Sequence, residues 1–195
     1  MSRTATCDRN TKETQIHIEL NIDGTGQYNI DTGVGFFDHM LEGFARHGLF
    51  DLTVKVKGDT QVDAHHTVED TGIVLGKAFL SALGDKAGIA RFGYFILPMD
   101  DALVLASLDF SGRMYFDFEA DLKAERLGTM ETEVVREFFM GLAGGVGMNL
   151  HIRQMAGENT HHVVEDMFKD VAKAMDMASK VDERIQGVLS TKGVL

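Results

Sequence analysis

Apolar and polar residues alternate through Ile16–Ile22, and this two-residue period predicts a half-buried β-strand. After a Gly-containing turn, a short second strand is expected around residues 27–30. Residues 36–44 carry apolar side chains at helical spacing, and the helix is predicted to end at Gly48. Alternation returns over residues 52–56. The last expected element of the first half is a helix with His65 near its start and core positions at Val68, Leu75 and Phe79.

The second half repeats this order of strand, strand, helix, strand and helix. The expected elements are one buried strand over residues 95–110 preceded by the turn at Pro98, a strand over 114–118, a helix over 132–143 ended by Gly144 and Gly145, a strand over 148–152 and a helix over 158–180. Adding 96 to residues 52–56 gives residues 148–152, so the repeat extends through whole elements.

Two β-β-α-β-α halves predict an α/β fold, an α+β sandwich whose helices pack between two mixed sheets. The 195 residues, 44% of them hydrophobic, are enough for a substantial core. No linker is visible between the halves, about residues 1–90 and 91–195. We therefore expect a single domain, residues 1–195, made of two pseudo-symmetric halves.

The charge balance narrows the classes of partner. A formal net charge of −11 argues against nucleic acid and against an anionic membrane, because both bind basic surfaces. The single cysteine, Cys7, excludes an internal disulfide and a Cys-based zinc site. No run is long and apolar enough for a membrane span or a signal peptide. The sequence therefore predicts a soluble, cytoplasmic protein that can still bind a small anionic substrate.

One six-residue motif occurs twice, as HHTVED over residues 65–70 and HHVVED over residues 161–166. On a helix, His65 and Glu69 share a face while His66 points about 100° away, so one helix can serve two metal centres. In the alternative interpretation, each His pair opens a solvated helix and the glutamates are ordinary first-turn acids. Two copies at matched positions favour metal binding.

Further candidate ligands come from the preceding helices. Asp38-His39 opens one of them, and Glu137 lies on its counterpart with an offset of 137 − 39 = 98, two residues out of register. Imidazole and carboxylate donors without thiolate suit Mn²⁺, Fe²⁺ or Zn²⁺, and the carboxylate content favours Mn²⁺. The candidate set, four ligands for each of two metals, is His39, His65, His66, Glu69, Glu137, His161, His162 and Glu165.

A phosphorylated substrate would require this acidic chain to concentrate its few cations. Lys169 lies on the helix face that carries the second motif's glutamate, and His47, eight residues after His39, could line the same pocket. His17 and His151 alternate with apolar strand residues and are interpreted as surface histidines. The candidate cations, each of which also fits an ordinary surface charge, are Arg91, Arg113, Lys169 and Lys192.

A series of motifs runs through the whole chain in order: residues 9–14, 35–41, 63–70, 91–93, 111–113, 150–151, 158–169 and 190–195. Their residues and spacing resemble the imidazoleglycerol-phosphate dehydratase family of histidine biosynthesis. The resemblance implies a hydro-lyase that converts imidazole glycerol phosphate to imidazole acetol phosphate with two Mn²⁺ ions per active site. It also implies a duplicated sandwich assembled into a 24-subunit shell with active sites between subunits.

The same resemblance assigns roles to individual residues. Glu13 would move the proton from a flexible N-terminal segment, and Glu137 stands where many relatives have a histidine ligand. Met114 replaces the proline common after Ser-Gly-Arg, a change expected to affect the turn more than the chemistry. The implied metal ligands are His39, His65, His66, Glu69, His161, His162 and Glu165; the implied phosphate ligands are Arg91, Arg113, Ser190 and Lys192, with Lys169 nearby.

Two other classes of protein use similar ligands. A di-metal storage bundle places Glu-x-x-His motifs on several long helices, whereas here His precedes Glu and half of the chain is predicted to be strand. A two-metal hydrolase of a phosphorylated small molecule would use metal-bound water as its nucleophile. Glu13→Gln distinguishes the two enzymes, because only the lyase gives that carboxylate an essential role.

Overall fold

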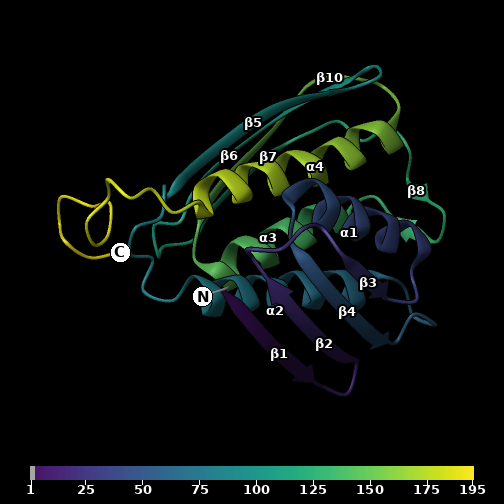
Figure 1. The fold of residues 1–195 in the computed structure, drawn as a ribbon. Coiled ribbons are helices and arrows are strands. Elements are labelled where there is room, and N and C mark those ends of the chain that lie inside the picture. Colours follow the sequence, from purple (N-terminus) through teal and green to yellow (C-terminus); the bar gives the residue numbers. More distant parts are fainter. Residues whose placement is uncertain (1–2) are drawn as a thin grey trace.

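Two four-stranded sheets form the outer layers of the molecule, and four helices lie between them in the computed structural model, which describes residues 3–195 (Figure 1). The first half contains β1 (Thr4–Asn10), β2 (Thr14–Asn21), β3 (Tyr28–Asp31), α1 (Gly35–Gly48), β4 (Asp51–Gly58) and α2 (His65–Leu83). The second contains β5 (Phe92–Met99), β6 (Ala102–Asp109), β7 (Tyr115–Glu119), the short hairpin β8 (Arg126–Leu127) and β9 (Met130–Glu131), α3 (Val134–Val146), β10 (Asn149–Ala156) and α4 (Thr160–Ser179).

Both sheets are mixed and have the same pattern of neighbours. The strand orders are β1-β2-β4-β3 and β5-β6-β10-β7, with β3 parallel to β4, β7 parallel to β10 and the other pairs antiparallel. In β2, Ile16 and Ile18 are buried against the helices while the intervening His17 lies on the outer face. The predicted α+β sandwich with helices between two mixed sheets is therefore confirmed. β4 and β10 are equivalent strands, but they are related by 149 − 51 = 98 residues and not by the predicted 96, so buried Leu52 and Val54 correspond to Leu150 and Ile152.

Glycines bring the backbones of α2 and α3 into close contact. A Cβ added to Gly72 would lie 2.3 Å from the Phe138 carbonyl oxygen, and one at Gly76 would lie 2.5 Å from that of Leu142. From the other side, a Cβ at Gly145 would lie 2.5 Å from the Ile73 carbonyl oxygen. No real side chain fits at such distances, so the glycines set the separation of these helices.

Aromatic side chains pack the other helices together. The rings of Phe138 on α3 and Phe168 on α4 stack with centroids 4.9 Å apart, and Phe37 on α1 meets Phe138 edge-on at 5.3 Å. All three are almost fully buried. Each such ring removes a large apolar area from water, and the edge and offset geometries are the favourable ones for aromatic pairs. This contact fixes α1 relative to α4, which carry the candidate ligands His39 and His161.

Three sequence predictions about the elements were wrong. The N-terminal residues form strand β1, which the alternation rule missed because none of its side chains is fully buried. Each half therefore begins with three strands, giving β-β-β-α-β-α. Residues 95–110 form the hairpin of β5 and β6, with the turn at Asp100, whose φ is +50°, while Pro98 lies within the edge strand β5. Apolar residues on both faces of β5 concealed this turn.

The end of α3 was the third error. The helix does not stop at Gly144 and Gly145 but continues to Val146, with Gly147 in the left-handed conformation as its C-cap. Gly145 instead serves the contact with α2, so its small size and not its flexibility matters here. Within residues 3–195, no helix combines the length and apolarity needed to cross a bilayer.

Candidate active site

Both His-His pairs occupy the first turn of a helix, and in each turn a nearby side chain accepts a backbone N–H hydrogen bond. In α4, the Asn159 side-chain oxygen accepts hydrogen bonds from the backbone N–H groups of His161 (3.0 Å) and His162 (3.4 Å). In α2, the Asp63 carboxylate accepts one from the His65 N–H (2.8 Å). Such bonds satisfy N–H groups that lack an acceptor within the helix. Asp63 and Asn159 therefore help to fix the helix starts at which the two motifs lie.

Three candidate ligands converge near the start of α4. Glu165 Oε2 lies 3.1 Å from His161 Nε2 on the same helix and 3.5 Å from His39 Nε2 on α1. The ligand atoms of all three residues lie within 4.8 Å of one another. The Glu165 side chain is only 13% exposed, whereas the imidazoles are about half exposed at 50% and 43%. This donor set, two imidazoles and a carboxylate open on one side, fits a divalent transition metal.

The two oxygens of Glu165 have different neighbours. Oε2 faces the imidazoles, and Oε1 accepts a hydrogen bond from Lys169 Nζ at 2.7 Å, one helical turn away. Burial raises the pKa of Glu165, but the hydrogen bond and charge of Lys169 and the nearby His39 outweigh it, so the pKa lies below its ordinary value. Glu165 is therefore a carboxylate at neutral pH, the form that binds metal.

The first motif has fewer neighbours in the same chain. His65 Nε2 lies 3.5 Å from Glu69 Oε2, and both side chains are more exposed than Glu165, at 41% and 35%. Glu137, predicted as a ligand on α3, has its carboxylate 3.3 Å from Arg136. Among residues 3–195, the cluster of His39, His161 and Glu165 is the one group of three or more donors close enough to share an ion.

The second histidine of each pair points to a carboxylate outside the motif. His66 Nδ1 lies 3.0 Å from Asp59 Oδ2, and His162 Nδ1 lies 2.7 Å from Asp101 Oδ1. The hydrogen bond to Asp59 raises the pKa of His66, and the negative charge of Glu13 acts in the same direction. Glu13 therefore lies within electrostatic reach of the first motif.

Glu13 itself is exposed in the turn between β1 and β2, where its N–H donates to the Thr11 hydroxyl at 3.1 Å. The residues before it form strand β1 instead of the flexible segment expected from the sequence. This turn places Glu13 at a defined point on the first sheet.

Two of the predicted phosphate ligands lie together at the C-terminal tail. Arg91 forms a double hydrogen bond with Asp109, Nε to Oδ1 at 2.6 Å and Nη2 to Oδ2 at 2.9 Å. Its third nitrogen donates to the Leu189 carbonyl oxygen at 2.6 Å. Arg91 and Ser190 line a hollow of about 520 Å³ with other residues of the tail. A hollow with a guanidinium and a hydroxyl suits an anion.

The remaining phosphate candidates do not line that hollow. Arg113 and Lys192 are exposed, and neither forms an ion pair with another described residue. Lys169 belongs to the metal-ligand cluster, with its Nζ also 3.5 Å from Met99 Sδ. Burial lowers the pKa of His47, and the positive charges of Lys169 and Lys173 lower it further, so His47 faces the same cationic region.

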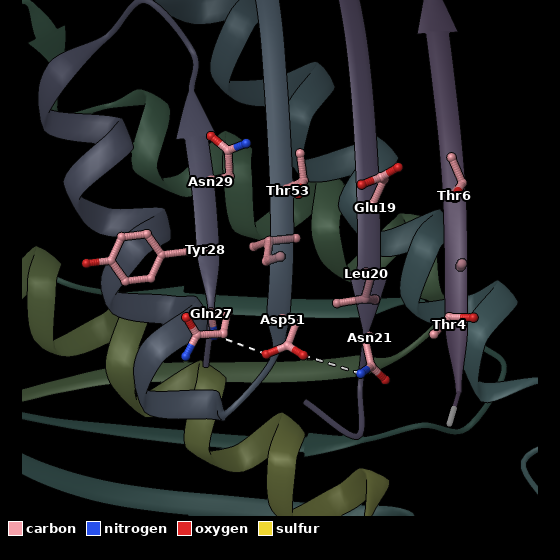
Figure 2. A pocket seen from close by; sticks show the side chains of 12 residues that line it. Thr4, Thr6, Glu19, Leu20, Asn21, Gln27, Tyr28, Asn29, Asp51 and Thr53 are labelled. Carbon is pink, nitrogen blue, oxygen red and sulfur yellow. Dashed lines mark hydrogen bonds between the residues drawn. The ribbon is translucent and has the colours of Figure 1, made fainter. Parts of the chain in front are cut away.

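Another hollow, of about 350 Å³, lies away from the candidate ligands. Figure 2 shows it on the face of the first sheet that points away from the helices, among Asn21, Tyr28, Asp51 and their neighbours. Asp51 Oδ1 accepts backbone N–H bonds from Thr25 (2.8 Å) and Gln27 (3.0 Å), so its role is to hold the turn before β3. No imidazole lines this hollow, and we assign it no part in the chemistry.

Several carboxylates that contact the candidate residues were not identified from the sequence. Asp59 follows the end of β4, Asp109 ends β6, and Asp101 lies in the turn between β5 and β6. Their positions at the ends of predicted strands could have identified them as candidates. For Asp101 that signal was lost because residues 95–110 were taken as one strand.

Comparison with known proteins gives consistent matches along the chain. The sequence model of the family "Imidazoleglycerol-phosphate dehydratase" matches residues 32–175. Curated relatives of that name from Lachnoclostridium phytofermentans and Acetivibrio thermocellus are 61% and 57% identical over 195 residues, covering all of both chains in each case. Among solved structures, the imidazoleglycerol-phosphate dehydratase of Staphylococcus aureus is 36% identical with a TM-score of 0.83, covering 92% of this chain and 99% of that chain. That of Pyrococcus furiosus, in complex with (S)-C348, is 40% identical with a TM-score of 0.84, covering 96% and 99%.

Proposed function

This chain belongs to the imidazoleglycerol-phosphate dehydratase family, and from that premise we propose that it is the hydro-lyase that converts imidazole glycerol phosphate to imidazole acetol phosphate in histidine biosynthesis. The position of the ketone in the product defines the reaction. The hydroxyl on the carbon next to the ring leaves as water, a hydrogen is removed from the following carbon, and the resulting enol becomes the ketone. The phosphate ester is unchanged.

The observation that carries this proposal is the convergence of His39, His161 and Glu165. The hydrogen to be removed lies on the second carbon from the ring and is not acidic, so the elimination needs the ring to take part. Ring electrons would expel the hydroxide from the adjacent carbon, and the ring would then take up the electron pair of the broken C–H bond. Bound Mn²⁺ would supply a Lewis acid to that ring. Glu165, ionised and held by Lys169, and the imidazole Nε2 atoms are the protein donors that would hold such an ion.

We assign two Mn²⁺ ions to each active site, as the resemblance implies. Imidazole and carboxylate donors without thiolate support this choice of metal. Besides the cluster on α4, the pair of His65 and Glu69 presents the same donor types one helical turn apart. The proposed ligands are His39, His65, His66, Glu69, Glu137, His161, His162 and Glu165.

This assignment requires self-association. Three of the eight proposed ligands gather in one chain, and His65 and Glu69 meet no third donor among the described residues. Since the candidate set gives four ligands to each of two metals and only three of them share one site among the described residues, we propose that a second copy of the chain completes the sites, within the 24-subunit assembly expected from the resemblance. The predicted cytoplasmic location remains a prediction.

The other proposed roles follow from position and charge. Glu13 would take the proton from carbon, since a general base must reach the reacting hydrogen and Glu13 lies within electrostatic reach of His66. Binding of the phosphate away from the reacting carbons would orient them. The proposed phosphate-binding residues are Arg91, Arg113, Ser190 and Lys192, with Lys169 and His47 nearby.

The test is turnover of imidazole glycerol phosphate by chelator-stripped protein before and after addition of Mn²⁺, with imidazole acetol phosphate and inorganic phosphate measured separately. Keto product that forms only with Mn²⁺ is the expected result. Released phosphate would instead identify the two-metal hydrolase. Keto product at the full rate without metal would refute the metal requirement and leave the lyase.

A further inference from the structure

The second histidine of both motifs is held by a carboxylate through the same ring nitrogen. His66 Nδ1 lies 3.0 Å and 3.3 Å from the two oxygens of Asp59. His162 Nδ1 lies 2.7 Å from Asp101 Oδ1. In both histidines Nδ1, the ring nitrogen closer to the backbone, contacts the carboxylate. The outer nitrogen, Nε2, remains available to another partner.

These two contacts are not copies of one another. The motifs are related by an offset of 96 residues, whereas Asp59 and Asp101 are separated by 101 − 59 = 42. Asp59 follows the end of β4 in the first half, and Asp101 lies in the hairpin turn that opens the second sheet. A carboxylate thus contacts Nδ1 of the second histidine in both motifs, although the two aspartates occupy unrelated positions in the fold. This recurrence argues that the contact has a function in the site.

The other candidate imidazoles also present Nε2. His65 and His161 direct Nε2 to the glutamate of their own motif, at 3.5 Å and 3.1 Å, and His39 Nε2 faces Glu165. His162 Nε2 has the exposed Asp100 carboxylate 3.6 Å away, too far for a hydrogen bond. A carboxylate on Nδ1 places the proton of a neutral imidazole there and leaves the Nε2 lone pair free.

We propose that Asp59 and Asp101 are positioning residues that fix His66 and His162 with Nε2 directed to the metal. This inference rests on the proposed metal-dependent function. Neither aspartate is assigned a direct metal bond. Each acts through a histidine by setting its ring orientation and the position of its proton.

Asp59 allows the cleaner test. Asp101 also accepts backbone N–H bonds from Glu158 (2.7 Å) and Asn159 (3.0 Å), so its removal would disturb the start of α4 as well. The Asp59 side chain bonds to His66 alone among the described residues. Asp59→Ala removes the acceptor, whereas Asp59→Asn keeps one oxygen that can accept from Nδ1–H.

The chain offers a matched control in Asp8. Its carboxylate lies 2.8 Å from His17 Nδ1, the same type of pair, on the outer face of the first sheet and outside the proposed site. The variants are compared by calorimetric titration of chelator-stripped protein with Mn²⁺. We expect Asp59→Ala to weaken Mn²⁺ binding about 10–100-fold, Asp59→Asn to weaken it less, and Asp8→Ala to leave it unchanged.

A second measurement needs no metal. Solid-state ¹⁵N spectra of histidine-labelled, metal-free protein at alkaline pH report which ring nitrogen carries the proton. In the wild type we expect His66 protonated at Nδ1, and in Asp59→Ala a transfer of that proton to Nε2. Spectra that are the same in both proteins would refute the inference, as would wild-type Mn²⁺ affinity in Asp59→Ala.

The two measurements separate this inference from the proposed function. If the wild type binds no Mn²⁺, the metal-dependent function fails whatever the spectra show, and the assignment of Nε2 to a metal fails with it. If the wild type binds Mn²⁺ and Asp59→Ala binds it equally well, only the role of Asp59 fails.

Discussion

The two His-His-x-x-Glu motifs differ in what surrounds them, although their sequences are nearly the same. At the start of α4, Glu165 has two imidazoles and the Lys169 ammonium within 3.5 Å. At the start of α2, Glu69 has one imidazole at the same limit and is more exposed. The two halves thus share the helix and its donors but not the neighbours of the donors. One motif is a compact cluster within the chain, and the other presents its donors outward.

The aspartate that follows each glutamate shows the opposite difference. Asp70 pairs with Arg9 at 2.9 Å and accepts a hydrogen bond from the Thr14 hydroxyl at 2.6 Å. Its counterpart Asp166 is fully buried, and among the described residues neither of its oxygens pairs with a cation or a side-chain donor. In the first half, polar contacts stabilise the aspartate of the motif, Asp70. In the second half, they are made by the candidate metal ligand Glu165.

The largest expected effect concerns the first motif. Glu13→Gln should lower kcat about 10²–10⁴-fold, because a positioned carboxylate that moves the proton contributes that much to catalysis. Mn²⁺ binding should remain, since Glu13 is not a proposed ligand. Steady-state turnover and metal titration of the same preparation check both expectations.

Glu19→Gln is the matched control for Glu13. Glu19 is an exposed glutamate on the outer face of β2 and should be replaceable without loss of turnover. If Glu13→Gln keeps wild-type kcat, Glu13 is not the base and the two-metal hydrolase becomes the better candidate.

The second prediction compares the glutamates directly. Glu165→Gln should weaken Mn²⁺ binding at least about tenfold in assembled protein and also in protein diluted until its copies separate. Glu69→Gln should have a comparable effect only in the assembled state, because its other ligands come from a second copy in our proposal. Metal titration at two protein concentrations, with sedimentation to establish the assembly state, measures this.

Equal effects of the two variants in both states would remove the contrast between the motifs. A loss in Glu69→Gln that persists on dilution would mean that one chain completes both metal sites by itself.

Local geometry explains which parts of this picture could be predicted from the sequence. The proximity of His161 and Glu165 follows from four-residue spacing on a helix, and the two-residue period located β2 and β4. The meeting of His39 with this pair is a tertiary contact and rested on the resemblance together with helix order. Strand β1 was missed because its half-buried positions carry only Ala5, Cys7 and Arg9, so its alternation of apolar and polar residues is weak.

Two other contacts between segments distant in the sequence were not predicted from it. Gly145 was taken as a helix terminator because glycine usually favours helix ends, yet its function is to let the α2 backbone approach. The contact between Asp101 and His162 depends on a hairpin turn hidden inside a continuous apolar run. The proposed roles of Glu137, Arg113 and Lys192 remain predictions, since no described contact tests them.

The third prediction concerns the support beneath the first motif. Arg9→Met should lower the free energy of unfolding by about 2 kcal/mol, because it leaves the buried Asp70 carboxylate with the Thr14 hydroxyl alone. The value is discounted because the Arg9 side chain is 36% exposed and water screens part of the pair. Urea unfolding at one fixed protein concentration is the measurement. A midpoint equal to that of the wild type would mean that the pair contributes nothing.

The smallest effect is expected in the second half, at the buried carboxyl one turn after Asp166. Burial and the negative charge of Asp166 raise the pKa of Asp170 from 3.8 to about 8. Between these values the folded protein keeps a proton that the unfolded chain has released, so the free energy of unfolding falls as pH rises through this window. Asp170→Asn removes this dependence and should stabilise the protein by about 1 kcal/mol at neutral pH. Unfolding of both proteins at acidic, neutral and mildly alkaline pH checks the sign. If the difference between variant and wild type does not grow with pH, Asp170 is already ionised in the fold, and the contrast with the well-paired Asp70 loses its energetic basis.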